Sequence, residues 1–349
     1  MARRFVLLFL AALLAAQSAC YGGYRKYSAG FFDYFDTYTN IIAYARSQAE
    51  FETAAKAVLT LIENDGKLFD IYNDYAGINN IKTINDNAGL APVPVDAAIL
   101  DLLEFSAEAY GITGGKVNAA MGPVLRVWHE YRIQGMGDTS NARLPPMETL
   151  RKLLEDTGIE NLIIDRQAGT AFLARPGMSL DVGALAKGFT LRRALEAARE
   201  AGLESALINI GGEIAALGSP MDSRDHWAVG VQDPFGEDGA RGIMDTVHIS
   251  GMALASSGDY QRFYTVEGVN YGHIIDPETL MPATRFTQVT VLHPDAGMAE
   301  ILSTAIFILP LDEGRDLLRQ NGADGLWITP DGSVEATPGF AAVSQNLAG

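Results

Sequence analysis

A histidine and an aspartate lie three residues apart in the segment 271–277, which reads Tyr-Gly-His-Ile-Ile-Asp-Pro. His273 could accept a proton near neutral pH, and a carboxylate such as that of Asp276 could orient its ring. The preceding segment 255–260, Ala-Ser-Ser-Gly-Asp-Tyr, places small and polar residues where a core strand would be apolar, which is typical of an active-site wall. An Asp-Pro pair also opens ordinary turns, so a structural turn is the alternative for these residues.

A second group of polar residues opens a predicted helix. The segment 180–188 reads Leu-Asp-Val-Gly-Ala-Leu-Ala-Lys-Gly, and helical spacing of apolar residues continues to about Ala201, where Gly202 is placed to end the helix. Backbone N–H groups at a helix N-terminus bind anions, and Lys187 adds a positive charge within the same helix. Glycine turns also serve packing alone, and from this segment by itself that alternative stays open.

Glu300 and Thr304 are spaced i and i+4 in a segment with helical periodicity, so their side chains would share one helix face. A carboxylate and a hydroxyl are hard oxygen ligands of the kind that Mg²⁺ binds together with water and phosphate. The alternative is a glutamate that faces solvent and a threonine that bonds to its own helix.

The composition limits the class of ligand. The chain has 349 residues, 48% of them apolar, which is enough for a sizeable core in one large domain or two ordinary ones. Its 43 acidic and 26 basic residues give a formal net charge of −17, which opposes attraction to nucleic-acid phosphates. We therefore expect no nucleic-acid partner. An anionic nucleotide would need local compensation from a lysine, backbone N–H groups or a divalent cation.

The N-terminus is typical of an export signal. Two arginines precede an apolar run at 5–16, and 12 residues are too few to cross about 30 Å of hydrocarbon as a helix. Cys20 is the only cysteine and follows two small residues, as at a lipoprotein cleavage site. We predict a signal peptide at 1–19, a lipid on Cys20 and a tether at 20–30. The alternative is an ordinary secretory signal with an incidental cysteine, and both place the mature protein outside the cytoplasm.

The remaining chain alternates helical and strand patterns. Helices are expected from Ser47, which opens a capping box, over 96–110 with Gly111 as the stop, after Pro146, and last over 298–308. Strands are expected at 206–210, 227–232, 243–249, 261–266, 288–292 and 325–329. Mixed helices and strands without a βαβ repeat predict an α+β fold with mostly antiparallel strands.

Taken together and in this order, these segments resemble the FAD:protein FMN transferase (ApbE-type) family. Relatives carry Asp-Leu-Gly-Gly-Ile-Ala-Lys-Gly where this chain has 181–188, and Ala-Asp-Ala-x-Ser-Thr where it has 299–304. They carry Thr-Asp-Gly-Ala-Phe-Asp at 113–118, where this chain reads Thr-Gly-Gly-Lys-Val-Asn. The segment 208–213, Ile-Asn-Ile-Gly-Gly-Glu, and the histidine segment complete the set. The resemblance covers about residues 31–340 and implies a single domain over 31–345 with the ApbE-like fold.

The resemblance implies a site for FAD and Mg²⁺. The residues implied to contact FAD are Phe35, Tyr72, Lys116, Val117, Asn118, Asp181, Lys187, Ser257, Gly258, His273 and Ile274. The implied metal ligands are the backbone carbonyl of Ala184 and the side chains of Glu300 and Thr304. The implied catalytic residues are His273 and Asp276. Glu300 and Asn118 depart from the family, in which both positions are usually aspartate, and whether Glu300 preserves metal binding stays open.

The implied activity is cleavage of FAD and attachment of FMN, through a phosphoester, to a Thr or Ser hydroxyl of a partner protein, with release of AMP. The implied partners are exported, flavin-accepting electron-transfer proteins, which fits an enzyme anchored in the membrane on its extracytoplasmic side. Two alternatives use the same site: a lipoprotein that holds FAD without transferring it, and a Mg-dependent pyrophosphatase that hydrolyses FAD.

One further segment echoes the family's substrate. Residues 331–337 read Asp-Gly-Ser-Val-Glu-Ala-Thr, close to the acceptor pattern Asp-Gly-x-Ser/Thr-Gly-Ala-Thr that the family flavinylates. Val334 and Glu335 break the pattern. A turn followed by the closing strand explains the segment better than self-modification.

Overall fold

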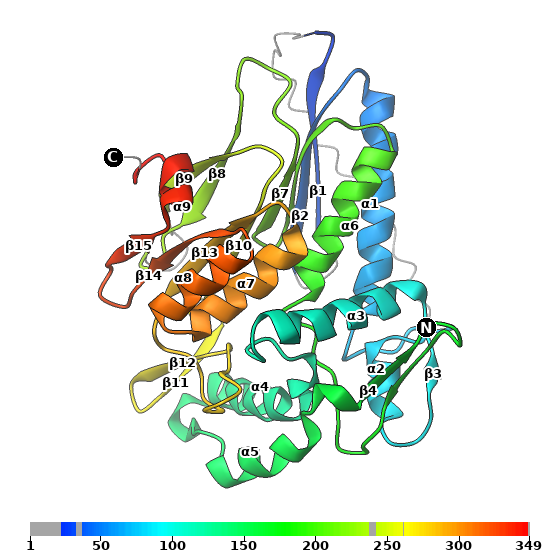
Figure 1. Cartoon of the computed structure of the whole chain (residues 1–349), viewed down its shortest axis with the longest axis vertical. Helices are drawn as coiled ribbons and strands as arrows, with labels where there is room; N and C mark the ends of the chain where they lie inside the picture. Colours follow the sequence, from blue (N-terminus) through cyan, green and yellow to red (C-terminus); the bar gives the residue numbers. More distant parts are fainter. Residues whose placement is uncertain (1–21, 33–36, 237–241, 261, 348–349) are drawn as a thin grey trace.

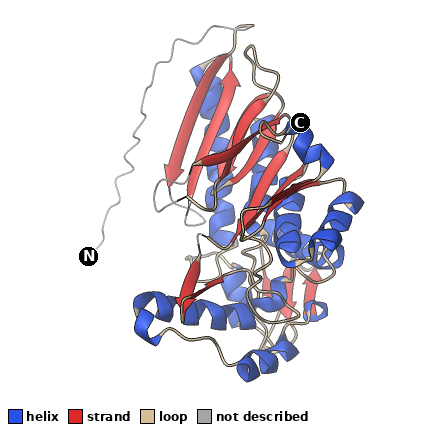
Figure 2. Cartoon of the chain, turned by 90° about the vertical axis from the view of Figure 1, so that its left-hand side faces the viewer, coloured by secondary structure: helices blue, strands red, loops and turns tan. Residues whose placement is uncertain are grey.

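The computed structural model describes residues 22–32, 37–236, 242–260 and 262–347, and a twisted eight-stranded sheet dominates it (Figure 1). Every neighbouring pair in this sheet is antiparallel, and Figure 2 shows the strands lying side by side in one layer. The strand order is β1 (Arg25–Phe32), β2 (Tyr38–Ala45), β6 (Ser205–Ile210), β7 (Glu213–Leu217), β10 (Ala253–Gly258), β13 (Gln288–His293), β14 (Asp324–Ile328) and β15 (Val334–Ala336). The predicted α+β class with mostly antiparallel strands is confirmed.

Helices cover one face of the sheet. They are α1 (Gln48–Leu68), α6 (Ala186–Glu200), α7 (Ala296–Ile308) and α8 (Leu311–Gln320). Sheet residues such as Ile208 and Val291 and helix residues such as Phe189 and Ile301 form one buried cluster between these layers. Burial of this apolar surface fixes how α6 and α7 lie relative to the strands.

The opposite face of the sheet carries a two-stranded hairpin, β8 (Trp227–Gln232) with β9 (Ile243–Ile249), and the short helix α9 (Pro338–Val343). Val229 and Val231 of the hairpin pack with Leu254 of β10 and Phe340 of α9 in a second buried cluster. The sheet therefore lies between two layers, and its central strands are covered on both faces.

A smaller, mainly helical part lies below the sheet in the view of Figure 1. Trp128 and Tyr264 pack there in a third cluster, and Trp128 Nε1 donates to the backbone oxygen of Leu280 at 2.9 Å. Its elements are α2 (Ile81–Asp86), β3 (Val93–Pro94), α3 (Ala97–Ile112), α4 (Gly122–Gly137), α5 (Met147–Leu153), β4 (Leu162–Asp165), β5 (Thr170–Leu173), β11 (Phe263–Val266) and β12 (Val269–Gly272).

Several boundaries agree with the sequence. Ser47 caps α1 by accepting from the N–H of Glu50 at 3.2 Å, and Gly202 follows α6 with φ of +94°. In the capping box itself, the Glu50 carboxylate accepts from the N–H of Arg46 rather than from Ser47. Both strands of the β8–β9 hairpin have the predicted bounds.

Three predictions of structure were wrong. Residues 25–30, expected in the tether, lie in β1, which pairs with β2 over eight residues. Helix α3 continues past Gly111 to Ile112, because Gly114 and Gly115, with φ of +59° and +84°, form the turn that follows it. The helix over 298–308 was predicted to be the last, but α7 (Ala296–Ile308) is followed by α8 and α9.

The predicted signal peptide and Cys20 lie outside the described residues. Within the described part, no helix combines the length and the apolar character needed to cross a bilayer.

Candidate active site

A large cavity, with a volume of about 810 Å³, opens at the end of the sheet where β10 ends at Gly258 and the β6–β7 turn begins at Gly211. Its volume lies in the upper part of the usual range for ligand pockets, about 300–1,000 Å³. Thirteen of the predicted site residues line it: Tyr72, Lys116, Val117, Asn118, Asp181, Ala184, Lys187, Ser257, Gly258, His273, Ile274, Glu300 and Thr304. Phe35 lies outside the described residues, and Asp276 is not part of the lining.

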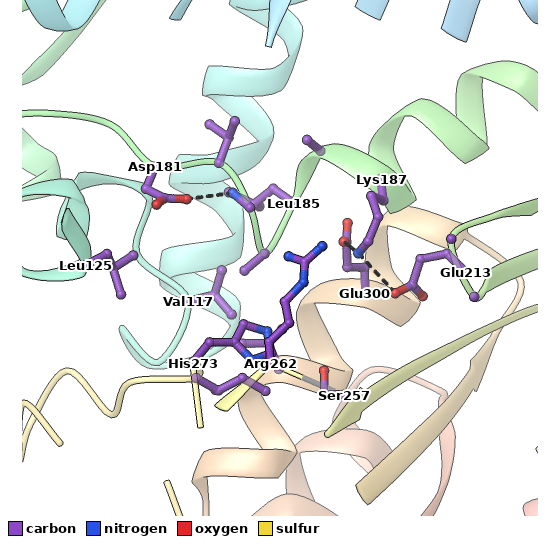
Figure 3. A pocket seen from close by; sticks show the side chains of 18 of the residues that line it. Val117, Leu125, Asp181, Leu185, Lys187, Glu213, Ser257, Arg262, His273 and Glu300 are labelled. Atoms are coloured by element: carbon purple, nitrogen blue, oxygen red, sulfur yellow. Dashed lines mark hydrogen bonds and ion pairs between the residues drawn. The ribbon is translucent and has the colours of Figure 1, made fainter. Parts of the chain in front are cut away.

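An ion-pair cluster forms one wall of the cavity (Figure 3). Lys187 on α6 contacts Glu300 Oε1 on α7 at 2.8 Å and Glu213 Oε1 on β7 at 3.2 Å. Glu300 and Glu213 are almost fully buried, whereas Lys187 is about a quarter exposed toward the cavity. One cation thus pairs with two buried carboxylates from separate elements, and buried charges require such partners.

The close approach of α6 and α7 depends on Gly188. Its N–H donates to Glu300 Oε2 at 2.6 Å, and a Cβ at this position would lie 2.5 Å from the backbone oxygen of Ala296. Any side chain would push the two helices apart. The glycine after Lys187 in the predicted anion-binding segment therefore sets the distance between the lysine and its carboxylate partner.

A two-residue turn brings Glu213 into the cluster. Gly211 and Gly212 connect β6 to β7 with φ of +60° and +97°, the combination that tight hairpins favour. The side chain of Asn209 accepts from the N–H of Gly212 at 2.8 Å, and a Cβ on Gly211 would lie 2.4 Å from Thr37 Oγ1. The turn therefore requires the two glycines, and it places Glu213 as the first residue of β7.

Charge and burial oppose each other within the cluster. Burial raises the pKa of Glu213 to about 7, although the positive charge of Lys187 acts against the shift. Burial alone would lower the pKa of Lys187, but Glu300 and Glu213 outweigh it and raise that pKa above its ordinary value. Glu213 Oε2 is buried and has no hydrogen-bond partner among the described residues.

His273 lies on the opposite wall, where it is well placed to act as a neutral base. Its Nδ1 is buried and lacks a hydrogen-bond partner in the described part of the chain. Burial, followed by the positive charges of Arg262, Arg132 and Lys187, lowers the pKa of His273 to about 4. The imidazole is therefore uncharged at neutral pH and able to accept a proton.

Asp276 does not orient the His273 ring through Nδ1, contrary to the prediction. Its Oδ1 accepts from Lys116 Nζ at 3.1 Å and from the N–H of Glu278 at 3.1 Å. Lys116 also pairs with Glu278 Oε1 at 2.8 Å, and it is only 10% exposed. Asp276 thus holds Lys116, which lines the cavity, and stabilises its own turn, while its own side chain is not part of the lining.

Two arginines that the sequence did not single out supply positive charge to the cavity. Arg132 comes from α4, and Arg262 follows the end of β10 and extends between His273 and the Lys187 cluster (Figure 3). Burial and the neighbouring Arg262 lower the pKa of Arg132, which marks two like charges close together. Neither arginine belongs to a recognisable motif. The two residues are 130 positions apart in the sequence, and only folding brings them to the same cavity.

The loop before α6 holds Asp181 at the cavity. The carboxylate accepts from the N–H of Gly183 at 2.9 Å, and burial raises its pKa despite this hydrogen bond and the nearby positive charge of Arg132. The neighbouring Asn118 accepts from the N–H of Ala120 at 2.9 Å and donates from Nδ2 to the backbone oxygen of Thr157 at 2.9 Å. A carboxylate at position 118 could not donate to the backbone oxygen of Thr157, so this hydrogen bond requires the asparagine amide.

Tyr72 lies at the rim of the cavity and is 62% exposed, with its ring 5.8 Å from that of His129.

The segment 331–337, which resembles the acceptor pattern, has a structural role. Thr337 caps α9, and its hydroxyl donates to Asp324 Oδ1 at 2.6 Å. That bond makes self-modification at Thr337 unfavourable.

Comparison with known proteins identifies the family. Residues 35–327 match the ApbE family. The FAD:protein FMN transferase of Treponema pallidum is 33% identical over 311 residues, which cover 84% of this chain and 82% of that protein. The FAD:protein FMN transferase of Klebsiella pneumoniae is 29% identical over 289 residues, covering 81% of this chain and 84% of the relative.

Solved structures agree with this match. The ApbE protein of Thermotoga maritima superposes with a TM-score of 0.78 at 28% identity, covering 91% of this chain and 99% of that one. The flavin transferase ApbE from Vibrio cholerae gives a TM-score of 0.74 at 25% identity, covering 91% of this chain and all of the other. Since the sequence match spans most of the chain and the fold is shared along nearly its full length, this protein belongs to the ApbE family.

Proposed function

We propose that this protein is an FAD:protein FMN transferase. The observation that carries the proposal is the meeting of a neutral imidazole, that of His273, with three cationic side chains, those of Lys187, Arg132 and Arg262, around one cavity. In a chain with a net charge of −17, Arg132 and Arg262 supply local positive charge that suits a pyrophosphate, whereas the charge of Lys187 is already shared by Glu213 and Glu300. The names of the relatives from Treponema pallidum and Klebsiella pneumoniae support the same activity.

FAD is the substrate, and its pyrophosphate would lie between α6 and the arginines. Lys187 lines this part of the cavity, whereas the N–H groups of Ala186 and Gly188 at the start of α6 already donate to Val182 and Glu300. Tyr72, Lys116, Val117, Asn118 and Ile274 line the remaining wall, which would hold the flavin and its ribityl chain. Asp181, Ser257 and Gly258 complete the proposed contacts.

The proposed metal is Mg²⁺, held by the backbone oxygen of Ala184 and the side chains of Glu300 and Thr304. All three residues border the cavity, and oxygen donors of these kinds suit a hard cation. The unpartnered Oε2 of Glu213 adds a buried acceptor on the same wall. No group of three or more His, Cys, Asp or Glu side chains able to hold a metal occurs in the described part of the chain. When bound, the ion would offset part of the negative charge of the pyrophosphate.

In the proposed reaction, side chains of this protein position the FAD phosphates and deprotonate the acceptor hydroxyl. The acceptor hydroxyl oxygen attacks the phosphorus of the FMN half and forms the phosphoester bond, while the bond from that phosphorus to the bridging oxygen breaks. The bonding electrons leave with AMP, and His273 takes the hydroxyl proton. Lys187, Arg132 and Arg262 stabilise the negative charge on the phosphate oxygens.

The test is transfer to a small domain that carries the acceptor pattern Asp-Gly-x-Ser/Thr-Gly-Ala-Thr. Protein, FAD, the domain and Mg²⁺ or EDTA are combined, and intact mass reports addition of FMN. We expect addition with Mg²⁺ and loss in His273→Ala and Thr304→Ala. AMP without a modified domain would indicate a pyrophosphatase, and bound, intact FAD would indicate a carrier.

We further propose that the protein is exported and anchored through a lipid on Cys20, and that its acceptors are exported electron-transfer proteins. The apolar run at 5–16 and the single cysteine after small residues support this. Metabolic labelling with a fatty acid should mark the wild-type protein and leave Cys20→Ala unlabelled. Label on the alanine variant, or none on the wild type, would contradict the anchor.

A further inference from the structure

The central strand β10 has a free edge beside the cavity. Its pairing with β7 comprises Ala253 with Ala215 and Leu254 with Ile214, whereas its pairing with β13 continues to Gly258. In the described part of the chain, no strand pairs with residues 255–258 on the β7 side. The sheet therefore splits at the point where the cavity opens.

Hydrogen bonds at both ends of β10 show which backbone groups face the free edge. The N–H of Ala216 donates to the oxygen of Met252 at 2.9 Å, so residue 252 faces β7, and the N–H of Asp259 donates to the oxygen of Thr287 at 3.2 Å, on the β13 side. Because alternate residues of an antiparallel strand bond to opposite neighbours, the N–H and C=O groups of Ser256 and Gly258 point to the free edge.

The cavity reaches both faces of the sheet at this edge. Ser257 Oγ lies 2.9 Å from Ser303 Oγ on α7, whereas Ser256 Oγ lies 2.9 Å from Thr290 Oγ1 on the face that carries the β8–β9 hairpin. Both serines line the cavity. Gly230 of β8 lines it too, and β8 pairs with β9 alone among the described strands.

We propose that the acceptor polypeptide binds here as an added strand, with its extended backbone paired to β10 at Ser256 and Gly258. This rests on the proposed transferase function. Side chains of an extended chain alternate between the two faces of a sheet, so a Thr or Ser paired at this edge can direct its hydroxyl to the helix face, where Lys187 of α6 lies across the cavity from His273. The residues on either side of it then face Gly230 and the hairpin.

An extended polypeptide fits this edge better than other ligands. Main-chain N–H and C=O groups in strand spacing are matched by another backbone, and strand addition gives affinity that is largely independent of side-chain identity. The cations proposed to bind the FAD phosphates lie on the other walls, and FAD is proposed to reach this edge only at Ser257 and Gly258, which leaves the backbone of Ser256 for the second substrate.

Amide exchange tests the pairing in the full chain loaded with FAD. The probe is the acceptor-pattern domain with its Thr or Ser acceptor residue replaced by Val, so that nothing is transferred. Residue-resolved hydrogen–deuterium exchange should slow about two- to tenfold at Ser256 and Gly258, the effect of one hydrogen bond at each site. Ala255 and Ser257, which face β13, serve as internal controls and should not change.

A variant gives an independent measurement. Ser256→Pro removes the N–H at the edge. The KM for the acceptor-pattern domain that keeps its Thr or Ser (the reactive domain) should rise at least about tenfold, because a backbone carbonyl of that domain loses its hydrogen-bond donor. Thr290→Val, which removes only the partner of the Ser256 hydroxyl, should change that KM less than about twofold. Thermal unfolding and FAD binding show whether Ser256→Pro is folded; if it is not, amide exchange decides.

The outcomes separate the two proposals. Transfer of FMN by the wild type, without protection of Ser256 and Gly258 at saturating probe, overturns strand addition and leaves the transferase standing. An equal rise of KM in both variants also overturns it, since packing would then be the cause. No transfer to the reactive domain by the wild type overturns the function and the strand together.

Discussion

The N–H of Gly188 on α6 donates to Glu300 Oε2 on α7 at 2.6 Å, and this bond joins the two helices at the wall of the active site. The same carboxylate binds Lys187 through its other oxygen. The longer side chain at position 300 thus has both oxygens engaged by consecutive residues of α6. The spacing of the helices, the lysine and the proposed metal ligand depend on one another.

Gly188→Ala should destabilise the protein by about 1–3 kcal/mol, the cost of forcing a methyl group into a packed contact. The added Cβ would meet the oxygen of Ala296 at 2.5 Å and Glu300 Cβ at 2.7 Å. Urea unfolding measures the change. Gly111→Ala is the matched control, because this helical glycine of α3 has nothing within 4 Å of its Cβ position, and it should gain about 0.5–1 kcal/mol. Equal effects of both substitutions would refute the close contact.

Glu213 should make the stability of the protein fall as the pH rises. Its pKa is about 7 in the folded state against an ordinary value of 4.5, so between these values the folded state binds more protons than the unfolded state. Glu213→Gln removes this contribution. The unfolding free energy of the variant minus that of the wild type should therefore increase by about 1–3 kcal/mol from pH 4.5 to pH 7.

Urea unfolding at several pH values, with EDTA present, measures this difference. Subtraction of the two proteins cancels other titrating groups, including His273, whose lowered pKa contributes with the opposite sign. A difference that stays constant with pH would show that Glu213 is already charged at pH 4.5 to 7 in the folded protein.

Elements with strong local signals were predictable from the sequence. Ser47 and Gly202 mark helix ends through their own backbone chemistry, and the β8–β9 hairpin alternates clearly. Strand β1 was missed because its alternation is short and weak: Tyr27, Ala29 and Phe31 of this edge strand pack against the core, but none of them is fully buried. Its pairing with β2 is what makes it a strand.

The site shows the same division between local and distant contacts. Motifs placed Lys187, Glu300 and His273 at one cavity. The partners of these residues were not predictable: Glu213 reaches Lys187 from another strand, and Arg132 and Arg262 approach His273 from separate elements. Asp276 was assigned to His273 because they are neighbours in sequence, whereas its partner Lys116 is 160 residues away.

Asp276→Asn should act on stability and leave the proton transfer unaffected. The loss of a charged partner for the nearly buried Lys116 should cost about 1–2 kcal/mol, measured by urea unfolding. Glu278→Gln, which alters the exposed partner of the same lysine, should cost less than about 0.5 kcal/mol. The pH dependence of kcat/KM should keep its acid limb in Asp276→Asn, and a shift of that limb would restore Asp276 as the partner of His273, the proposed base.

His273 should remain neutral far below its ordinary pKa of 6.5. Burial and the surrounding cations lower the pKa to about 4, so the neutral form that accepts a proton persists until the pH falls through that value. The titration of its ring carbon signal by NMR, in protein without FAD, measures this directly. Among the five histidines of the chain, His273→Gln identifies the signal.

Arg132→Gln should raise the midpoint of His273, because removal of a nearby positive charge makes protonation easier. Arg166→Gln is the control, since Arg166 pairs with Asp101 and Glu104 outside the cavity and should leave the midpoint unchanged. A wild-type midpoint near 6.5 would mean that His273 is solvated and free to ionise. The base would then lose half of its neutral form near pH 6.5, and the acid limb of kcat/KM would lie there instead of near 4.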